Sequence, residues 1–443
     1  MGYKRGGIIM DKWENQIKMR VNPQVPASVE QRMNETLRSL PKKKTYPRFY
    51  YPVAAVFLVG FLLFGISFMS PTLAETLRSV PVIGSIFKMV GDIGTQKGEQ
   101  EGLTTLLGQQ VEIDGQVITF TESLYDGSQI HIGYLIESYT QEKTTYPTDF
   151  LSNLQLTIDG KGVSYGMGER GEVLENGDYA GILSIHVDDE LPDQFTLGIR
   201  SQKEKALHVE LPITKQGENR AFLVNETVES EDLTMHVDKV TFFPTSTEIM
   251  FRQIMDEKVF ESKKYDWLDY QIVDDKGNVL QPFSGGGGGG PMKNGQLLQT
   301  FNYYYEPLET IPRSLTFKPY LIVGNEKVEE VKADWTGEKL TLSQGGIGEI
   351  TVLDIKSENN LVTLIVETKG DDAFWQANSI LIEKRNGEPF HQEKTPKRVE
   401  NALNQYEVQF AADVAEEDIR IVTYKQKAPK FLEELEVTIE LGE

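Results

Sequence analysis

The chain has 443 residues, with 45 basic and 67 acidic side chains and no cysteine. The lack of cysteine excludes disulfides, thiolate zinc sites and cysteine nucleophiles. The formal net charge of −22 argues against nucleic-acid binding by the acidic bulk of the chain, and the length predicts several domains.

Residues 1–48 form a basic segment with two amphipathic helical patterns. In the first pattern apolar residues recur at helical spacing until Pro23, and in the second Ser28 caps a helix with one apolar side. Short isolated helices are marginal in water, so a partner protein or the inner membrane leaflet must cover them. Glu30 and Glu35 lower the net positive charge of the second helix, which favours a partner protein over the inner leaflet. We predict six partner-binding residues in this tail: Trp13, Ile17, Val29, Met33, Leu37 and Leu40.

A membrane-spanning helix is predicted over residues 49–70. The sequence from Phe49 to Ala74 contains no charged residue. At about 1.5 Å per residue, residues 49–70 span roughly 33 Å, which matches a hydrocarbon layer of about 30 Å. The preceding segment of 48 residues is too long for the leader of a cleavable signal, and the helix lacks the polar face of a core helix.

The charge distribution predicts the orientation of this span. Residues 1–48 contain 11 lysines and arginines against four acidic residues, whereas the remainder is strongly acidic. The positive-inside rule therefore places the N-terminal tail in the cytoplasm and the C-terminal bulk outside the cell. We expect a single-pass protein of the cell membrane.

Two short juxtamembrane helices are predicted over residues 71–102. Leu77, Ile83 and Val90 belong to an apolar series at helical spacing, and Pro81 interrupts the series. Two interpretations are open: the helices lie on the outer membrane surface, or they pack on the first domain.

From residue 103 onward the apolar pattern alternates, which predicts β-strands. Two alternating runs joined by a short polar turn occur three times, with Ile118, Met235 and Ile350 at equivalent places. In the first copy, residues 125–128 read Tyr-Asp-Gly-Ser, a hairpin signal. Strand-rich repeats of about 115 residues are typical of tandem β-sandwiches. We predict immunoglobulin-like β-sandwich domains over residues 103–217, 218–338 and 339–443.

No catalytic, cofactor or metal site is predicted, and we do not expect an enzyme. Ser284 and Gly285–Gly290 lack the Gly-Lys-Ser or Gly-Lys-Thr ending of a phosphate-binding loop, so we expect a flexible loop between strands. No Gly-x-Ser-x-Gly elbow occurs. The histidines show no metal-ligand spacing, and we expect each to be an outward-facing strand residue rather than a metal ligand or a general base: His131, His186, His208, His236 and His391.

One aromatic group follows the glycine run: Phe301, Tyr303, Tyr304 and Tyr305. It could form a platform for a carbohydrate or a partner. Aromatic residues in strands more often pack in the core and across strands, so core packing is the favoured interpretation.

Several stretches together resemble a family of membrane-anchored anti-sigma-factor-like proteins of Gram-positive bacteria. These are VNPQVPASVEQRMNETLRSL, the predicted span, SPTLAETLRSVPVIGSIFKMVGDIG and VITFTESLYDGSQIHIGYLI. The family carries an extracellular domain of unknown function, often followed by an immunoglobulin-like domain. The resemblance covers residues 10–250 well and the remainder loosely, and it suggests Met10 as the natural start.

This resemblance implies a cytoplasmic tail that holds a sigma factor inactive and outer domains that sense an envelope signal. Because the chain has no cysteine, zinc-assisted sigma binding is excluded. A second function class is also open: an envelope protein that binds wall polymer or another surface protein, with the tail as an anchor only.

Overall fold

The computed structural model describes residues 84–442, except 114–115, 138–150, 152–153, 188, 202–206, 291, 293, 325–328, 393 and 400–401. The predicted span, the tail helices and the six partner-binding residues lie outside the described residues. Within the described ranges, none of the helices has the length and apolar character needed to cross a membrane. Antiparallel sheets dominate these ranges, which confirms the prediction of a mainly β structure.

Two short helices, α5 (Ile86–Val90) and α6 (Ile93–Gln100), precede the first strand. Ser85 caps α5 by accepting a hydrogen bond from the backbone N–H of Lys88, and Asp92 caps α6 by accepting one from Thr95. The helix break therefore lies at Gly91 and Asp92, whereas the break predicted at Pro81 lies outside the described residues.

Helix α5 packs on the strands that follow it. Ile86 and Phe87 are buried in a small cluster with Leu124, Leu135 and Ile182. For this part of the juxtamembrane segment, packing on the first domain is the interpretation that the structure supports.

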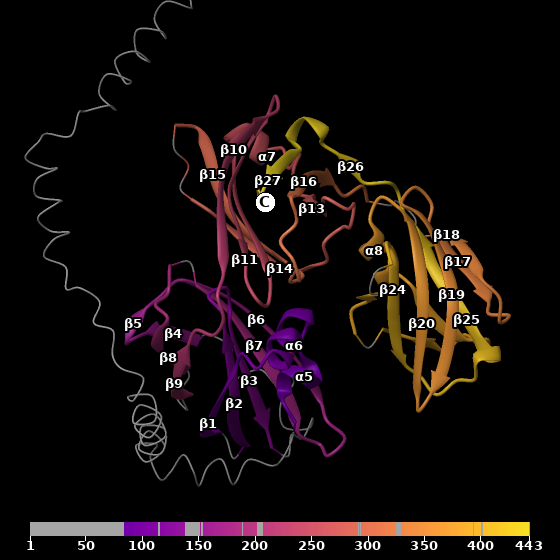
Figure 1. Cartoon of the computed structure of the whole chain (residues 1–443), viewed down its shortest axis with the longest axis horizontal. Coiled ribbons are helices and arrows are strands. Elements are labelled where there is room, and N and C mark those ends of the chain that lie inside the picture. The colour runs from indigo at the N-terminus through magenta and orange to yellow at the C-terminus, as the bar shows by residue number, and fades with distance from the viewer. Residues whose placement is uncertain are drawn as a thin grey trace, which may run out of the picture. The chain divides into compact units, whose positions relative to one another are not determined.

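The first module comprises strands β1–β9 (Figure 1). Its two sheets, ordered β1-β2-β3-β7-β6 and β5-β4-β8-β9, share one hydrophobic core. The strands are β1 (Thr104–Ile113), β2 (Gln116–Tyr125), β3 (Ile130–Ile136), β4 (Leu154–Ile158), β5 (Lys161–Gly162), β6 (Tyr165–Val173), β7 (Tyr179–Val187), β8 (Gln194–Ser201) and β9 (His208–Thr214).

The second module comprises β10–β16 together with β26 and β27. One sheet has the order β10-β11-β12-β15-β14, and in the other β16 pairs with β13, β26 and β27. The elements are β10 (Arg220–Glu229), β11 (Leu233–Phe242), β12 (Thr247–Asp256), α7 (Glu257–Glu261), β13 (Leu268–Asp274), β14 (Pro282–Gly289), β15 (Gln296–Tyr305), β16 (Ser314–Leu321), β26 (Lys430–Phe431), a 3-10 turn (Glu433–Leu435) and β27 (Val437–Glu440).

The third module comprises β17–β25, with sheets ordered β18-β19-β20-β24-β23 and β17-β25-β21-β22 around its own core. Its elements are β17 (Glu329–Asp334), β18 (Leu340–Ser343), β19 (Gly348–Glu358), β20 (Leu361–Gly370), α8 (Ala373–Asn378), β21 (Leu381–Lys384), β22 (Pro389–Phe390), β23 (Lys397–Arg398), β24 (Gln405–Ala411), a 3-10 turn (Glu416–Asp418) and β25 (Ile419–Lys425).

The internal repeat is confirmed in the three five-stranded sheets. Each begins with a three-strand meander, and the second and third strands are joined by the predicted short turn. A β-bulge shifts the register of this hairpin at equivalent places, at Thr121, Asp238 and Leu353. The three residues matched in the sequence, Ile118, Met235 and Ile350, are all buried three positions before the bulge.

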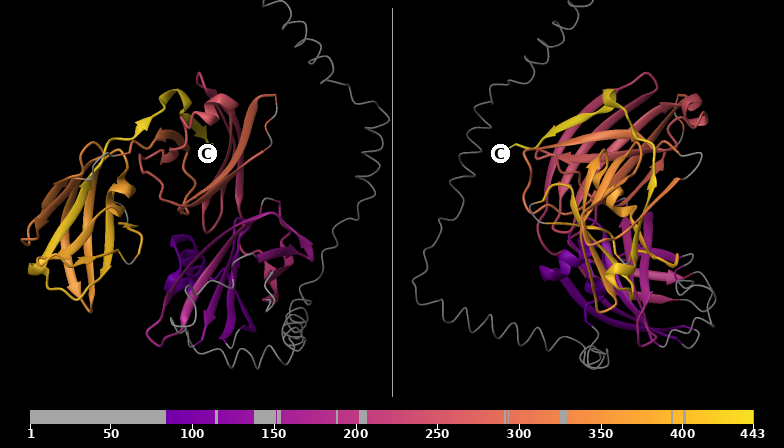
Figure 2. Two further views of the ribbon diagram at one scale, coloured as in Figure 1. Left: turned by 180° about the vertical axis from the view of Figure 1, so that it is seen from behind. Right: turned by 90° about the vertical axis from the view of Figure 1, so that its right-hand side faces the viewer.

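Strands β26 and β27 belong to the second module, whereas the sequence pattern predicted that they belong to the third. Residues 339–443 were expected to form one domain, yet Val437 pairs with Phe317, and Lys430 pairs with Leu321. Leu435 and Ile439 are buried in the core of the second module. The third module is therefore inserted between β16 and β26, and the chain returns to complete the second module (Figure 1, Figure 2).

The glycine run was expected to be a flexible loop, and that prediction is wrong. Residues up to Gly289 form the edge strand β14, which pairs with β15. The ring of Phe301 lies so close to Gly287 that a Cβ there would be 2.2 Å from Cδ1 of the ring. Glycine inside a strand usually weakens the strand, but here the missing side chains make room for aromatic rings of the neighbouring strand.

Candidate functional site

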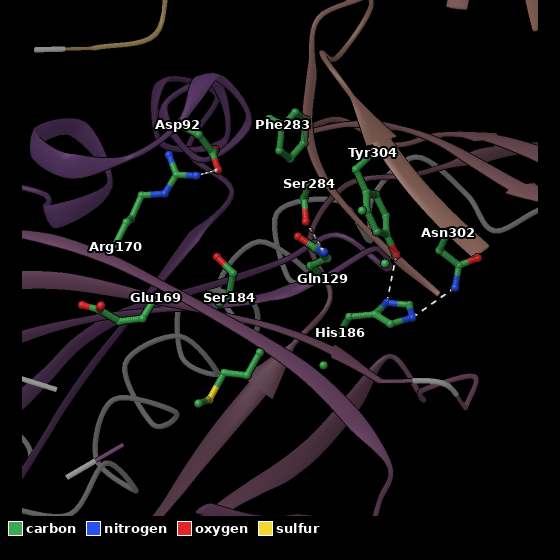
Figure 3. A pocket seen from close by; sticks show the side chains of 15 residues that line it. Asp92, Gln129, Glu169, Arg170, Ser184, His186, Phe283, Ser284, Asn302 and Tyr304 are labelled. Carbon is green, nitrogen blue, oxygen red and sulfur yellow. Dashed lines mark hydrogen bonds and ion pairs between the residues drawn. The ribbon is translucent and has the colours of Figure 1, made fainter. Parts of the chain in front are cut away.

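A polar cavity of about 400 Å³ lies where the first and second modules meet (Figure 3). The first module contributes residues of β6 and β7, among them Arg170 and His186. The second module contributes Ser284 from β14 and Tyr304 from β15. Concave sites with a few convergent polar groups are the usual places for small ligands, so this cavity is the candidate functional site.

His186 joins the two modules through both ring nitrogens (Figure 3). The hydroxyl of Tyr304 lies 2.9 Å from Nδ1 and donates to Glu248 at 3.0 Å. Nδ1 must then carry the proton and donate to the Tyr304 oxygen. Nε2 accepts from the side-chain amide of Asn302 at 3.1 Å. This network joins β7 of the first module to β15 of the second.

Two further features of the second module give the cavity its chemistry. Burial, together with the nearby Glu248, raises the pKa of Tyr304, which keeps the phenol protonated. The side-chain oxygen of Asn302 is buried and has no hydrogen-bond partner within the described residues. Such an acceptor is costly to leave unpaired, so Asn302 is held here by its bond to His186 and by its place in the strand.

The wall from the first module is held by charged residues. Glu169 accepts hydrogen bonds from the hydroxyls of Tyr134 at 2.8 Å and Tyr179 at 2.7 Å. Arg170 forms an ion pair with Asp92, the cap of α6, at 3.4 Å. Negative, positive and neutral polar groups therefore line one cavity, which suits a small polar ligand.

His131 lies behind this wall, and its predicted outward position is wrong. The side chain is only 3% exposed, and Nδ1 lies 2.9 Å from the hydroxyl of Ser184, which lines the cavity. Burial lowers the pKa of His131, so the ring is neutral at physiological pH. Among the other histidines, His208 and His391 are exposed as predicted.

Beside the cavity, Asp126 holds the two modules together. Its carboxylate accepts from the hydroxyl and the backbone N–H of Thr245 in the β11–β12 turn, at 2.6 and 2.9 Å. It also accepts from the hydroxyl of Ser128 at 2.6 Å, within the predicted hairpin turn. The carboxylate is fully buried, so this turn is a connection between modules as well as a hairpin signal.

Sequence patterns did not reveal this cavity. The predicted tail residues lie outside the described part, and in the described part no three His, Asp or Glu side chains come together as a metal site. His186 lies in one alternating run, and Asn302 and Tyr304 lie in another, 116 and 118 residues further along the chain. Polar residues at those strand positions were the available signal, but they matter only once two modules meet.

The aromatic group divides between two environments. Tyr305 is buried in the core of the second module, which confirms core packing for that residue, whereas Tyr304 is buried at the polar cavity and bonds His186 and Glu248. Phe301 and Tyr303 are only partly buried and pack against the core of the second module.

Comparisons with known proteins give two family matches, each to part of the chain. Residues 43–138 match a domain of unknown function (DUF4179), which is found in anti-sigma-factor-like proteins. Residues 219–352 match a family of unknown function (DUF5643). A solved structure described as the conserved domain protein from Bacillus anthracis is similar at 18% identity and a TM-score of 0.40, over 57% of this chain and 90% of that chain. No curated protein matches the chain.

Proposed function

We propose that the protein is a single-pass membrane regulator whose cytoplasmic tail sequesters a sigma factor and whose outer immunoglobulin-like modules sense an envelope signal. The observation that carries this proposal is the match of residues 43–138 to a domain found in anti-sigma-factor-like proteins. The matched range begins before the predicted span over 49–70 and continues through α5, α6 and the first three strands. No residue is assigned a catalytic role, and no cofactor is required.

Contacts of α5 and α6 support a route from the outer modules toward the predicted span. Glu122 of β2 accepts hydrogen bonds from the hydroxyl of Ser85 at 2.9 Å and the backbone N–H of Phe87 at 3.2 Å. These bonds attach α5 to the first module.

Helix α6 also contacts the second module. Lys97 forms an ion pair with Glu309 at 2.9 Å. A Cβ on Gly94 would lie 2.4 Å from the backbone oxygen of Thr245, so only glycine allows the helix to approach this turn so closely. A ligand that changes the junction of the two modules therefore acts directly on the segment that follows the predicted span.

Affinity purification of the full chain from its own cell membranes tests the proposal. The perturbed variant carries Val29→Asp, Met33→Asp and Leu37→Asp on the apolar side of the second tail helix. The matched control carries Gln31→Asp, Asn34→Asp and Ser39→Asp on its polar side, so both variants add the same charge.

We expect the wild type and the control to retain a sigma factor and the apolar-side variant to lose it. If the wild type retains none, or if the apolar-side variant retains it equally, the regulator proposal fails. In that case the envelope-binding alternative, with the tail as an anchor, is the function to pursue.

A further inference from the structure

A second cavity, of about 480 Å³, lies within the second module alone. Strands β12 and β15 form one wall, and α7 with the loop that leads to β13 forms the other. Its walls are rich in aromatic side chains, and two of these are unusually exposed. Trp267 is 70% exposed and Phe260 is 45% exposed. Exposed apolar surface that is contiguous, as around this cavity, marks binding sites more often than a single exposed side chain does.

The loop that presents Trp267 is held firmly. Lys264 forms an ion pair with Asp232 in the β10–β11 turn and lies over the ring of Tyr265. The backbone N–H of Leu268 donates to the oxygen of Tyr265, and the oxygen of Trp267 accepts from Ile322. The exposed indole therefore sits on an ordered support, as a preformed binding surface requires.

The opposite wall is also fixed. The rings of Phe301 and Phe251 stack with their centroids 5.2 Å apart, and Tyr303 meets Tyr270 edge to face at 5.2 Å. Strand β14 has no side chain at Gly287, so the ring of Phe301 rests against its backbone. Glycines of β14 therefore leave room for the rings of Phe301 and Tyr303, and these two rings line the cavity.

Several polar groups of the lining have no hydrogen-bond partner among the described residues. The side chains of Gln299, Asp266 and Trp267 form no hydrogen bond there, and neither does the hydroxyl of Tyr303. Together they offer donors and acceptors around the aromatic surfaces. Gln299 faces Gln253 across β12 and β15, so two carboxamides lie side by side on this wall.

We propose that this aromatic cavity binds a neutral saccharide, with Trp267 against the face of a sugar ring and Gln299 and Tyr303 hydrogen-bonded to its hydroxyl groups. A sugar ring has apolar C–H faces and a rim of hydroxyls, so it matches both kinds of surface. This inference gives a ligand class to the envelope-sensing function proposed above.

Two other occupants fit the lining less well. A quaternary ammonium group favours aromatic cages but makes no hydrogen bonds, so the polar groups of Trp267, Gln299 and Tyr303 would play no part in binding it. A phosphate polymer needs cationic partners, yet the described lining contains an acidic residue, Asp266, and no lysine or arginine.

The test measures binding to the full chain, purified in a detergent with neither a sugar nor a choline headgroup. The probes are the hexasaccharides of N-acetylglucosamine and of glucose, with choline chloride and inorganic phosphate as competing chemistries. Isothermal titration gives the dissociation constants, and tryptophan fluorescence reports contact with the indole. The tail plays no part in this measurement, so the saccharide site and the regulator function can fail independently.

The variants are Trp267→Ala and Gln299→Leu, and the matched control is Trp375→Ala, an exposed tryptophan on α8 of the third module. We expect one hexasaccharide to bind the wild type and the control, and each cavity variant to weaken binding by about tenfold or more, equivalent to about 1.4 kcal/mol. Because both side chains are at least partly exposed, these variants should keep the fold. The absence of saturable binding by both hexasaccharides would overturn the proposal, as would equal binding by Trp267→Ala or tighter binding of choline or phosphate.

Discussion

Replacing one glycine of β14 tests how the aromatic wall is built. A Cβ on Gly287 would lie 2.2, 2.5 and 2.8 Å from three ring atoms of Phe301, and that ring is stacked on the fully buried Phe251. The ring cannot move inward, so Gly287→Ala should cost about 1–3 kcal/mol through overpacking.

The neighbouring Gly288 supplies the control. A Cβ there would meet nothing within 4 Å, and the backbone of both glycines lies outside the left-handed region. Gly288→Ala should therefore stabilise the module by about 0.4–1 kcal/mol, because alanine restricts the unfolded chain. This restriction of the unfolded chain applies equally to Gly287→Ala. The difference in stability between the two variants therefore measures the cost of displacing the Phe301 ring.

Native-state hydrogen exchange of peptides that cover residues 282–305 measures this difference. At about 1.4 kcal/mol per factor of ten, exchange should be roughly fivefold or more faster in Gly287→Ala than in Gly288→Ala. Equal exchange in the two variants would refute the packing of Phe301 on β14. Faster exchange in Gly288→Ala would contradict the open space at Gly288.

Three further predictions concern the junction of modules, pH and the returning strands. Asp126→Asn should weaken the buried contact with Thr245 by about 1–3 kcal/mol. Limited proteolysis between the first and second modules should then be faster. The control Asp159→Asn, on an exposed turn of the first module, should leave the rate of proteolysis unchanged. Burial raises the pKa of Asp372 from 3.8 to about 6. The folded state then binds the proton more tightly than the unfolded state, so the third module should lose stability as pH rises from about 4 to about 6, and Asp372→Asn should flatten this dependence in urea unfolding. Deleting residues 430–442 removes five buried apolar side chains (Leu432, Leu435, Val437, Ile439 and Leu441) from the second module. At about 1.5–3 kcal/mol each, their loss matches the whole stability of a typical domain, so calorimetry should lose the second module's transition and keep the third's.

The β-rich repeat could be predicted because its signals are local. Alternation of apolar residues and the turn residues around Asp126 act within a few positions, and β2 and β3 form as expected. The return of β27 could not be predicted, because Val437–Glu440 is a short alternating run that fits a sheet edge in either module. Its pairing with β16 depends on a contact distant in the chain.

The cavities were hidden for a related reason. Gly287 carries no strand propensity, and only the ring of Phe301 on the next strand shows why glycine stands there. His186, Asn302 and Tyr304 form a network only after two modules have folded and met. The hairpins of the repeat could therefore be predicted from the sequence, whereas the glycine-rich strand β14 and the surfaces that the strands create together could not.

The insertion of the third module also sets an order of events in folding. While the chain emerges, β16 precedes its partner β27 by the length of a whole domain, and closing so long a loop is entropically unfavourable. Within the third module, however, Glu329 pairs with Lys425, so its folding brings the two connecting segments together. Once the third module has folded, pairing β27 with β16 therefore has the entropic cost of closing a short loop. We expect the third module to fold early and to guide the second to completion, so that a substitution which slows the third should delay both.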